Sequence, residues 1–253
     1  MTRSTPATLP PSHAVHVRLI ESSASEMRLA EARTFVRDRA EHADVLLVAG
    51  SRGAADDLAR SIARESGATI GLHRSSLTQL AARLAAPALA ADGRSPATAL
   101  GSEAIAARAA FEAHKTHSLG YFEPVARTPG FPRALARTLQ ELRLADVRAA
   151  RLATLPLGGR DLSVLLEKFE EQFVAASSSD RATLFQRATE VLRSRAPDPL
   201  TPALLLLDVP MDSHLEFEFV RALIGACPAV LITVPFGDQL AAVPLCGLWT
   251  AAP

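Results

Sequence analysis

Short apolar runs alternate with helical patterns along the first 74 residues of the chain. The runs that we expect to form strands are residues 15–20, 45–50 (VLLVAG) and 68–72 (ATIGL). Apolar side chains recur at helical spacing in residues 29–39 and 54–67, and Gly67 is expected to end the second helix. Strands that alternate with helices predict a parallel sheet with crossover helices.

The pattern changes at about residue 75. From there to residue 199 the chain is rich in alanine and leucine at helical spacing, interrupted by prolines and glycines, which predicts a mostly helical insertion. Strand patterns return at 203–210 (ALLLLDVP) and 229–235 (AVLITVP), with a helical stretch between them. We therefore predict an α/β fold with these parts: a disordered lead-in at 1–13, a sheet-bearing core at 14–74 and 200–240, a helical insertion at 75–199, and an irregular tail at 241–253.

Composition narrows the classes of protein that fit. The 253 residues are 48% hydrophobic, and 27 basic side chains balance 27 acidic ones, so a strongly basic nucleic-acid binder is disfavoured. Cys227 and Cys246 are too few for a disulfide framework and are expected to be buried or free thiols. No run reaches the ~20 apolar residues that span a bilayer, and no signal peptide is evident, so we expect a cytoplasmic protein without a membrane partner.

The turn after the first predicted strand is where a phosphate-binding loop would lie. Such a loop has the pattern G-x-x-x-x-G-K-[ST], in which glycines let backbone amides close on phosphate. Over residues 21–28, Glu21 and Glu26 stand in place of the glycines, Met27 in place of the lysine and Arg28 in place of the hydroxyl. Because the two carboxylates would repel a polyphosphate, we expect a degenerate Walker A site that holds no nucleotide cofactor.

Asp208, at the end of the ALLLL run, has the position of a Walker B acid, which holds magnesium through water. The adjacent Val209 replaces the glutamate that would activate the attacking water. We expect Asp208 to cap the following turn. The alternative is a divergent magnesium-dependent nucleotide hydrolase that uses Asp208 and Asp212.

Three segments carry a resemblance to a known family: VLLVAGSRGAADDLARSIARESGATIGLHRSSLTQLAARL, YFEPVARTPGFPRALARTLQELRLADV and LLLLDVPMDSHLEFEFVRALIGACPAVLITVPFGDQ. Over residues 15–240 the chain resembles the N-terminal part of bacterial PD-(D/E)XK nuclease family proteins of the AddB type. In these proteins an inactivated superfamily 1 (UvrD-like) helicase domain precedes a nuclease. The resemblance implies a RecA-like (P-loop NTPase-like) fold and a non-catalytic module in DNA end processing, double-strand break repair and recombination.

By this resemblance, residues 45–60 correspond to the strand and turn that touch single-stranded DNA in helicases. The arginines around them are Arg52, Arg60, Arg64 and Arg74. Acidic residues lie among them, so we expect weak, salt-dependent binding of phosphates. Residues 230–239 correspond to a strand that ends in a Gly-Asp-x-x-Gln motif, which the sequence only approximates. The partners implied are single-stranded DNA and either a helicase–nuclease subunit or a C-terminal nuclease domain.

A PD-(D/E)XK centre needs an acidic pair and a lysine two residues after the second acid. The two lysines of the chain, Lys115 and Lys168, follow Ala113 and Leu166 at that spacing, so the sequence predicts no nuclease centre in this chain. A truncated, inactive fragment is the third alternative.

Two weaker features lie in the predicted insertion. His114 and His117 have a spacing that can bind metal, but no further ligand lies nearby, and we expect solvated histidines and no metal. Arg133, Arg137 and Arg143 are expected to lie on a solvated helix face, with Arg137 paired to a glutamate one turn on.

Overall fold

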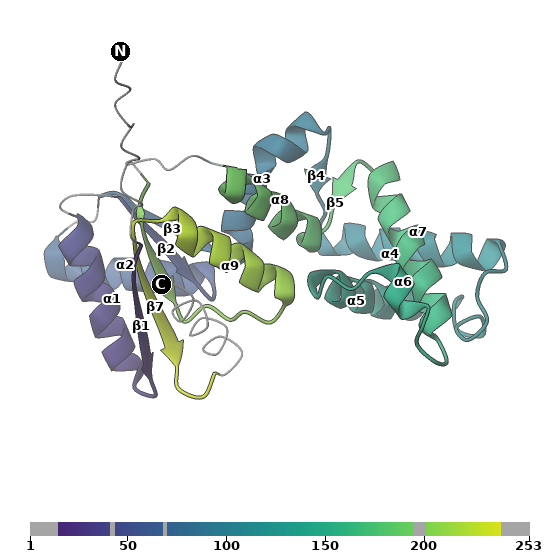
Figure 1. Ribbon diagram of the computed structural model, residues 1–253, viewed down its shortest axis with the longest axis horizontal. Coiled ribbons are helices and arrows are strands. Elements are labelled where there is room, and N and C mark those ends of the chain that lie inside the picture. Colours follow the sequence, from purple (N-terminus) through teal and green to yellow (C-terminus); the bar gives the residue numbers. More distant parts are fainter. Residues whose placement is uncertain (1–14, 41–43, 68–69, 195–200, 239–253) are drawn as a thin grey trace, which may run out of the picture.

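A five-stranded parallel sheet forms the centre of the larger lobe (Figure 1). The computed structural model describes residues 15–40, 44–67, 70–194 and 201–238, so the predicted lead-in and tail lie outside the described residues. The strand order is β1-β7-β6-β2-β3, and every neighbouring pair is parallel. The strands are β1 (His16–Ser22), β2 (Val45–Ala49), β3 (Leu72–Ser76), β6 (Ala203–Leu207) and β7 (Ala229–Pro235). The predicted α/β class is therefore confirmed.

The central strands are the apolar ones. Every residue of β2 and β6 is buried, as is every residue of β7 except Pro235. Continuous apolar runs are typical of parallel strands that helices cover on both faces. The outer strands β1 and β3 contain exposed positions instead. The distribution of apolar residues thus fixes which strands lie in the middle.

Helices cover both faces of the sheet. On one face α1 (Ser25–Ala40) and α2 (Arg52–Ser66) pack against side chains such as Leu47, Leu205 and Leu231. On the other face α3 (Leu77–Ala91), α8 (Arg181–Ser194) and α9 (His214–Ala226) pack against the alternate residues, such as Leu204 and Ile232. This alternation follows from the period of two along a strand.

A helical lobe with its own core lies beside the sheet (Figure 1). Its helices are α4 (Ala99–Lys115), α5 (Phe131–Leu144), α6 (Ala149–Leu152) and α7 (Gly159–Ala175). Two short strands, β4 (Ser95–Pro96) and β5 (Ser178–Ser179), pair in parallel where the chain enters and leaves the lobe. Although α3 and α8 fall within the predicted insertion at 75–199, they pack on the sheet, so the separate helical core consists of α4 to α7.

Two local predictions are wrong. The third strand was expected at 68–72 but runs from Leu72 to Ser76. The residues that pair with β2 are mostly polar, so the apolar pattern did not locate them. The eight-residue turn expected at 21–28 is also wrong: β1 continues to Ser22 and α1 begins at Ser25. Only two residues connect the first strand to its helix.

Candidate functional site

The carboxyl ends of β1, β6 and β7 meet at the edge of the sheet where open α/β folds bind ligands. Residues 23 and 24 join β1 to α1, and Ser22 Oγ accepts a hydrogen bond from the Ala24 N–H at 3.1 Å. A phosphate-binding loop needs several backbone N–H groups that converge on one point. A two-residue connection, with one of its N–H groups already bonded, does not provide that cradle.

Arg28 occupies the space in front of the central strands. Its side chain is only 8% exposed and points from the first turns of α1 to Asp208 at the end of β6. The guanidinium donates from Nε to Asp208 Oδ1 at 3.0 Å and from Nη2 to Asp208 Oδ2 at 3.0 Å. A further N–H bonds the Ser22 carbonyl oxygen. The arrangement is the planar, two-pronged pairing that arginine makes with a carboxylate.

Thr233 of β7 completes the contacts of the carboxylate. Its hydroxyl donates to Asp208 Oδ1 at 2.7 Å, while the Asp208 N–H donates to the Thr233 carbonyl oxygen at 3.1 Å. Asp208 has a φ of 47°, a left-handed conformation that aspartate adopts more readily than most residues. The expectation that Asp208 caps the following turn is wrong, because Ser213 caps α9 and the Asp208 carboxylate binds Arg28 and Thr233.

The other residues of the degenerate Walker A pattern do not converge on this pair. Glu26 lies in the first turn of α1, and the Met27 side chain is 57% exposed. Glu21 accepts only a long contact, 3.5 Å, from the Gly237 N–H. Arg28 is therefore the one residue of the predicted Walker A set that the structure brings to Asp208, and its guanidinium contacts both oxygens of that carboxylate.

The arginines expected to contact DNA are mostly paired. Arg52 and Arg74 each contact Asp56 at 3.2 Å, and Arg60 pairs with Asp57. These pairs reduce the positive charge that a phosphate would meet.

Of the four predicted arginines, Arg64 alone makes no ion pair with a described residue. Weak phosphate binding by these four arginines stays a prediction.

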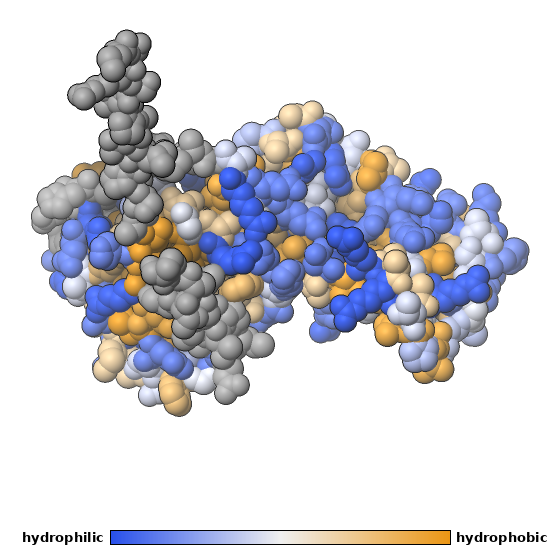
Figure 2. Space-filling view, in the orientation of Figure 1, coloured by the Kyte–Doolittle hydropathy of each residue, from blue (hydrophilic) through white to orange (hydrophobic). Residues whose placement is uncertain are grey.

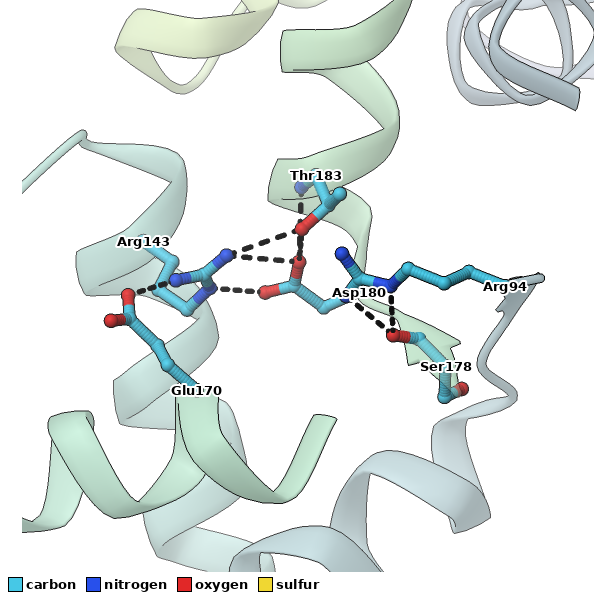
Figure 3. A network of polar contacts seen from close by, with 6 residues as sticks. All are labelled: Arg94, Arg143, Glu170, Ser178, Asp180 and Thr183. Atoms are coloured by element: carbon cyan, nitrogen blue, oxygen red, sulfur yellow. Dashed lines mark hydrogen bonds and ion pairs between the residues drawn. The ribbon is translucent and has the colours of Figure 1, made fainter. Parts of the chain in front are cut away.

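A network of polar side chains joins the helical lobe to the sheet-bearing lobe (Figure 3). Arg143 of α5 contacts both oxygens of Asp180, donates to Thr183 Oγ1 at 3.2 Å and pairs with Glu170 of α7. The Asp180 side chain is 1% exposed and also accepts the Thr183 N–H at 2.9 Å. The expectation that Arg143 lies on a solvated face is wrong, whereas Arg137 pairs with Glu141 as expected.

Burial and the charge of Arg143 act in opposite directions on the pKa of Asp180. Burial by itself raises the pKa of the Asp180 carboxyl, but the hydrogen bonds and charge of Arg143, with the bonds from Thr183, outweigh it and hold that pKa below its ordinary value. Nearby, Arg94 donates to the Ser178 carbonyl oxygen at 3.1 Å. Sequence reasoning missed this network because Arg143 and Asp180 lie on separate elements and belong to no motif.

The remaining candidates have structural surroundings. His114 Nδ1 lies 2.7 Å from Glu123 Oε1. His117 follows the C-cap residue of α4 and has a left-handed φ of 51°, a conformation that closes helix ends. Among the described residues, no three metal-binding side chains come together.

Cys227 is a buried free thiol whose pKa burial raises to about 12, while Cys246 lies outside the described residues. No described helix has the length and apolar character needed to cross a membrane.

No model of a known protein family and no curated protein matches this sequence. The resemblance to proteins of the AddB type therefore rests on residues of the three sequence segments alone.

Proposed function

We propose that this chain is a helicase-like module of a DNA end-processing protein of the PD-(D/E)XK nuclease family, without nucleotide chemistry of its own. It acts as a scaffold for a partner subunit or nuclease domain and binds single-stranded DNA weakly, in the cytoplasm. The sheet positions neighbouring domains, and another subunit or domain drives any translocation.

The observation that carries the proposal is the Arg28–Asp208 pair. In a working site the Walker B carboxylate holds magnesium through water. Here an internal cation already neutralises that carboxylate, with two N–H groups at 3.0 Å, and the strand-to-helix connection is two residues long. Both features support a role without nucleotide binding.

Calorimetry with ATP and magnesium tests the nucleotide part of the proposal. We expect no heat of binding at millimolar ATP, and a dissociation constant in the micromolar range would overturn the proposal. An ATPase assay compares the wild-type chain with Asp208→Ala. ATP turnover that this substitution abolishes would establish the alternative, a magnesium-dependent hydrolase.

The DNA part is tested by fluorescence anisotropy with a labelled oligo(dT). We expect weak binding that falls steeply as salt rises, because phosphate contacts release counterions. Arg64→Ala should weaken it more than Arg60→Ala, since Arg60 already pairs with Asp57. Salt-independent binding, or equal effects of the two variants, would contradict this assignment.

A further inference from the structure

The corner between α6 and α7 presents apolar side chains to solvent. The exposed fractions are 51% for Leu155, 82% for Leu157 and 57% for Tyr121. Tyr121 lies against this corner, since a Cβ atom on Gly158 would lie 2.9 Å from the Tyr121 ring. Figure 2 shows hydrophobic side chains at this end of the helical lobe, below the α6 label of Figure 1.

Leu157 combines an exposed side chain with an unfavourable backbone conformation. Its φ is 57°, in a turn that the Gly159 N–H closes onto the Pro156 carbonyl oxygen at 3.3 Å, with a φ of −77° at Gly158. A turn with positive φ at its first central residue only is dominated by glycine, asparagine and aspartate. A bulky apolar residue there costs free energy, and such strain persists mainly at functional sites.

The other left-handed residues that are not glycine have recognisable roles. Asp208 belongs to the sheet-edge site described above. His117, Asp146 and Ser177 each follow the C-cap residue of a helix, where a left-handed residue closes the helix end. Leu157 has neither role, which leaves the presentation of its side chain as the explanation.

The corner is also rigid. Asp161, which is buried, accepts the N–H groups of Gly120 at 3.0 Å and Phe122 at 2.9 Å, and so fixes the loop that carries Tyr121. Packing behind the turn is tight, because a Cβ atom on Gly159 would lie 2.5 Å from a backbone carbonyl oxygen. Rigid surfaces lose little entropy on binding, which favours recognition.

Positive charge borders the apolar centre. Residues 120–160 contain seven arginines and three acidic residues, although the whole chain is neutral. Arg151 and Arg160, on either side of the turn, are exposed and make no ion pair with any residue the structure describes. We call the surface of Tyr121, Arg151, Leu155, Leu157 and Arg160 the corner surface. Its positive charge favours a ligand with carboxylates. Its two leucines favour a ligand that also offers an apolar contact, which phosphates do not provide.

We propose that the corner surface docks a protein partner whose apolar centre is bordered by acidic side chains. The inference rests on the scaffold role of the proposed function and identifies the surface through which the scaffold holds its partner. Tyrosine and arginine are enriched in such interfaces. The strain at Leu157 is the cost of keeping an apolar anchor exposed in the free protein.

Two labelled helical peptides of equal length test the charge preference. Both carry the same leucine face, and the remaining positions are glutamate in one and lysine in the other. Titration with the full chain, followed by fluorescence anisotropy, should show binding of the glutamate peptide only. Salt raised from about 50 to about 300 mM should weaken that binding, because it screens the border charges. Equal binding of the two peptides would overturn the proposal.

Variants of the corner surface test the location. Leu157→Asn should weaken glutamate-peptide binding by at least about tenfold while the melting temperature stays the same or rises, because asparagine tolerates a left-handed φ. Arg151→Glu combined with Arg160→Glu should weaken it similarly. The matched control is Phe111→Asn on α4, a side chain 61% exposed, which should leave binding unchanged.

Three results would overturn the inference. Peptide binding that Leu157→Asn leaves intact would show that the corner surface does not dock the peptide. Self-association in sedimentation that Leu157→Asn abolishes would indicate a second copy of the chain as the occupant, and a double arginine variant that loses oligo(dT) binding but keeps peptide binding would indicate a nucleic-acid surface. ATP binding in calorimetry would contradict the proposed function and leave the peptide result unchanged, so the two failures are distinguishable.

Discussion

Removal of the Arg28 side chain should destabilise the fold more than removal of any exposed arginine. Arg28→Ala deletes two close N–H contacts to Asp208 and the bond to the Ser22 carbonyl oxygen. It leaves a carboxylate that is 31% exposed, and among the described residues its remaining side-chain donor is the Thr233 hydroxyl. Breaking a fully buried ion pair costs about 3–5 kcal/mol. Because Asp208 regains some water, we expect a loss of about 2–3 kcal/mol in the free energy of unfolding.

Urea denaturation of the full chain at neutral pH measures this loss, and for a domain of this size the melting temperature should fall by roughly 5–10 °C. Arg137→Ala is the matched control, since the Arg137–Glu141 pair is 83% and 64% exposed and should contribute below about 0.5 kcal/mol. Arg28→Met combined with Asp208→Asn removes both charges together and should recover part of the loss. Equal destabilisation by Arg28→Ala and Arg137→Ala would refute the reasoning.

Three further predictions concern the network, the thiol and the glycines. Asp180→Asn should lower the free energy of unfolding by about 2–4 kcal/mol at pH 7. Because the pKa of Asp180 in the folded chain lies below its ordinary value of 3.8, the stability that its charge contributes is complete above pH 3.8 and is lost as the pH falls further. Wild type and variant should therefore converge in acid unfolding titrations. Cys227, with a pKa of about 12, should resist a thiol reagent at pH 8 in the native chain of a Cys246→Ser background and react once urea unfolds it; rapid native labelling would contradict its burial. Gly159→Ala should destabilise by about 1–3 kcal/mol because the new Cβ meets a carbonyl oxygen at 2.5 Å, whereas Gly225→Ala, with open space on α9, should stabilise by about 0.5–1 kcal/mol in thermal melts.

The apolar runs predicted the middle of the sheet well because helices cover both faces of those strands. Residues 45–49, 203–207 and 229–235 are buried almost throughout, so hydropathy alone identifies them. The edge strand β3 was misplaced because its sequence, LHRSS, is polar, and only its hydrogen bonds to β2 define it. Burial is readable in a sequence, whereas pairing with a neighbour is not.

The candidate site was predicted in part. Both Arg28 and Asp208 were identified by position, but their pairing was not, because they lie 180 residues apart and the strand order brings them together. The eight-residue alignment of the degenerate Walker A pattern concealed a two-residue connection. Arg143 was expected in solvent because a helical pattern shows only which face of a helix is polar. It does not show that the Asp180 carboxylate of the other lobe contacts that polar face.

The pairing of β4 with β5 brings the two ends of the helical lobe together, since Ser95 lies opposite Ser178. The chain therefore enters and leaves the helical lobe at one point, and α3 and α8 pack on each other beside it. An insertion attached in this way can be gained, enlarged or exchanged during evolution without new strand pairings. A minimal version with a short glycine–serine linker in place of the lobe would also need an uncharged residue at position 180, because without Arg143 the buried Asp180 carboxylate has lost its ion pair.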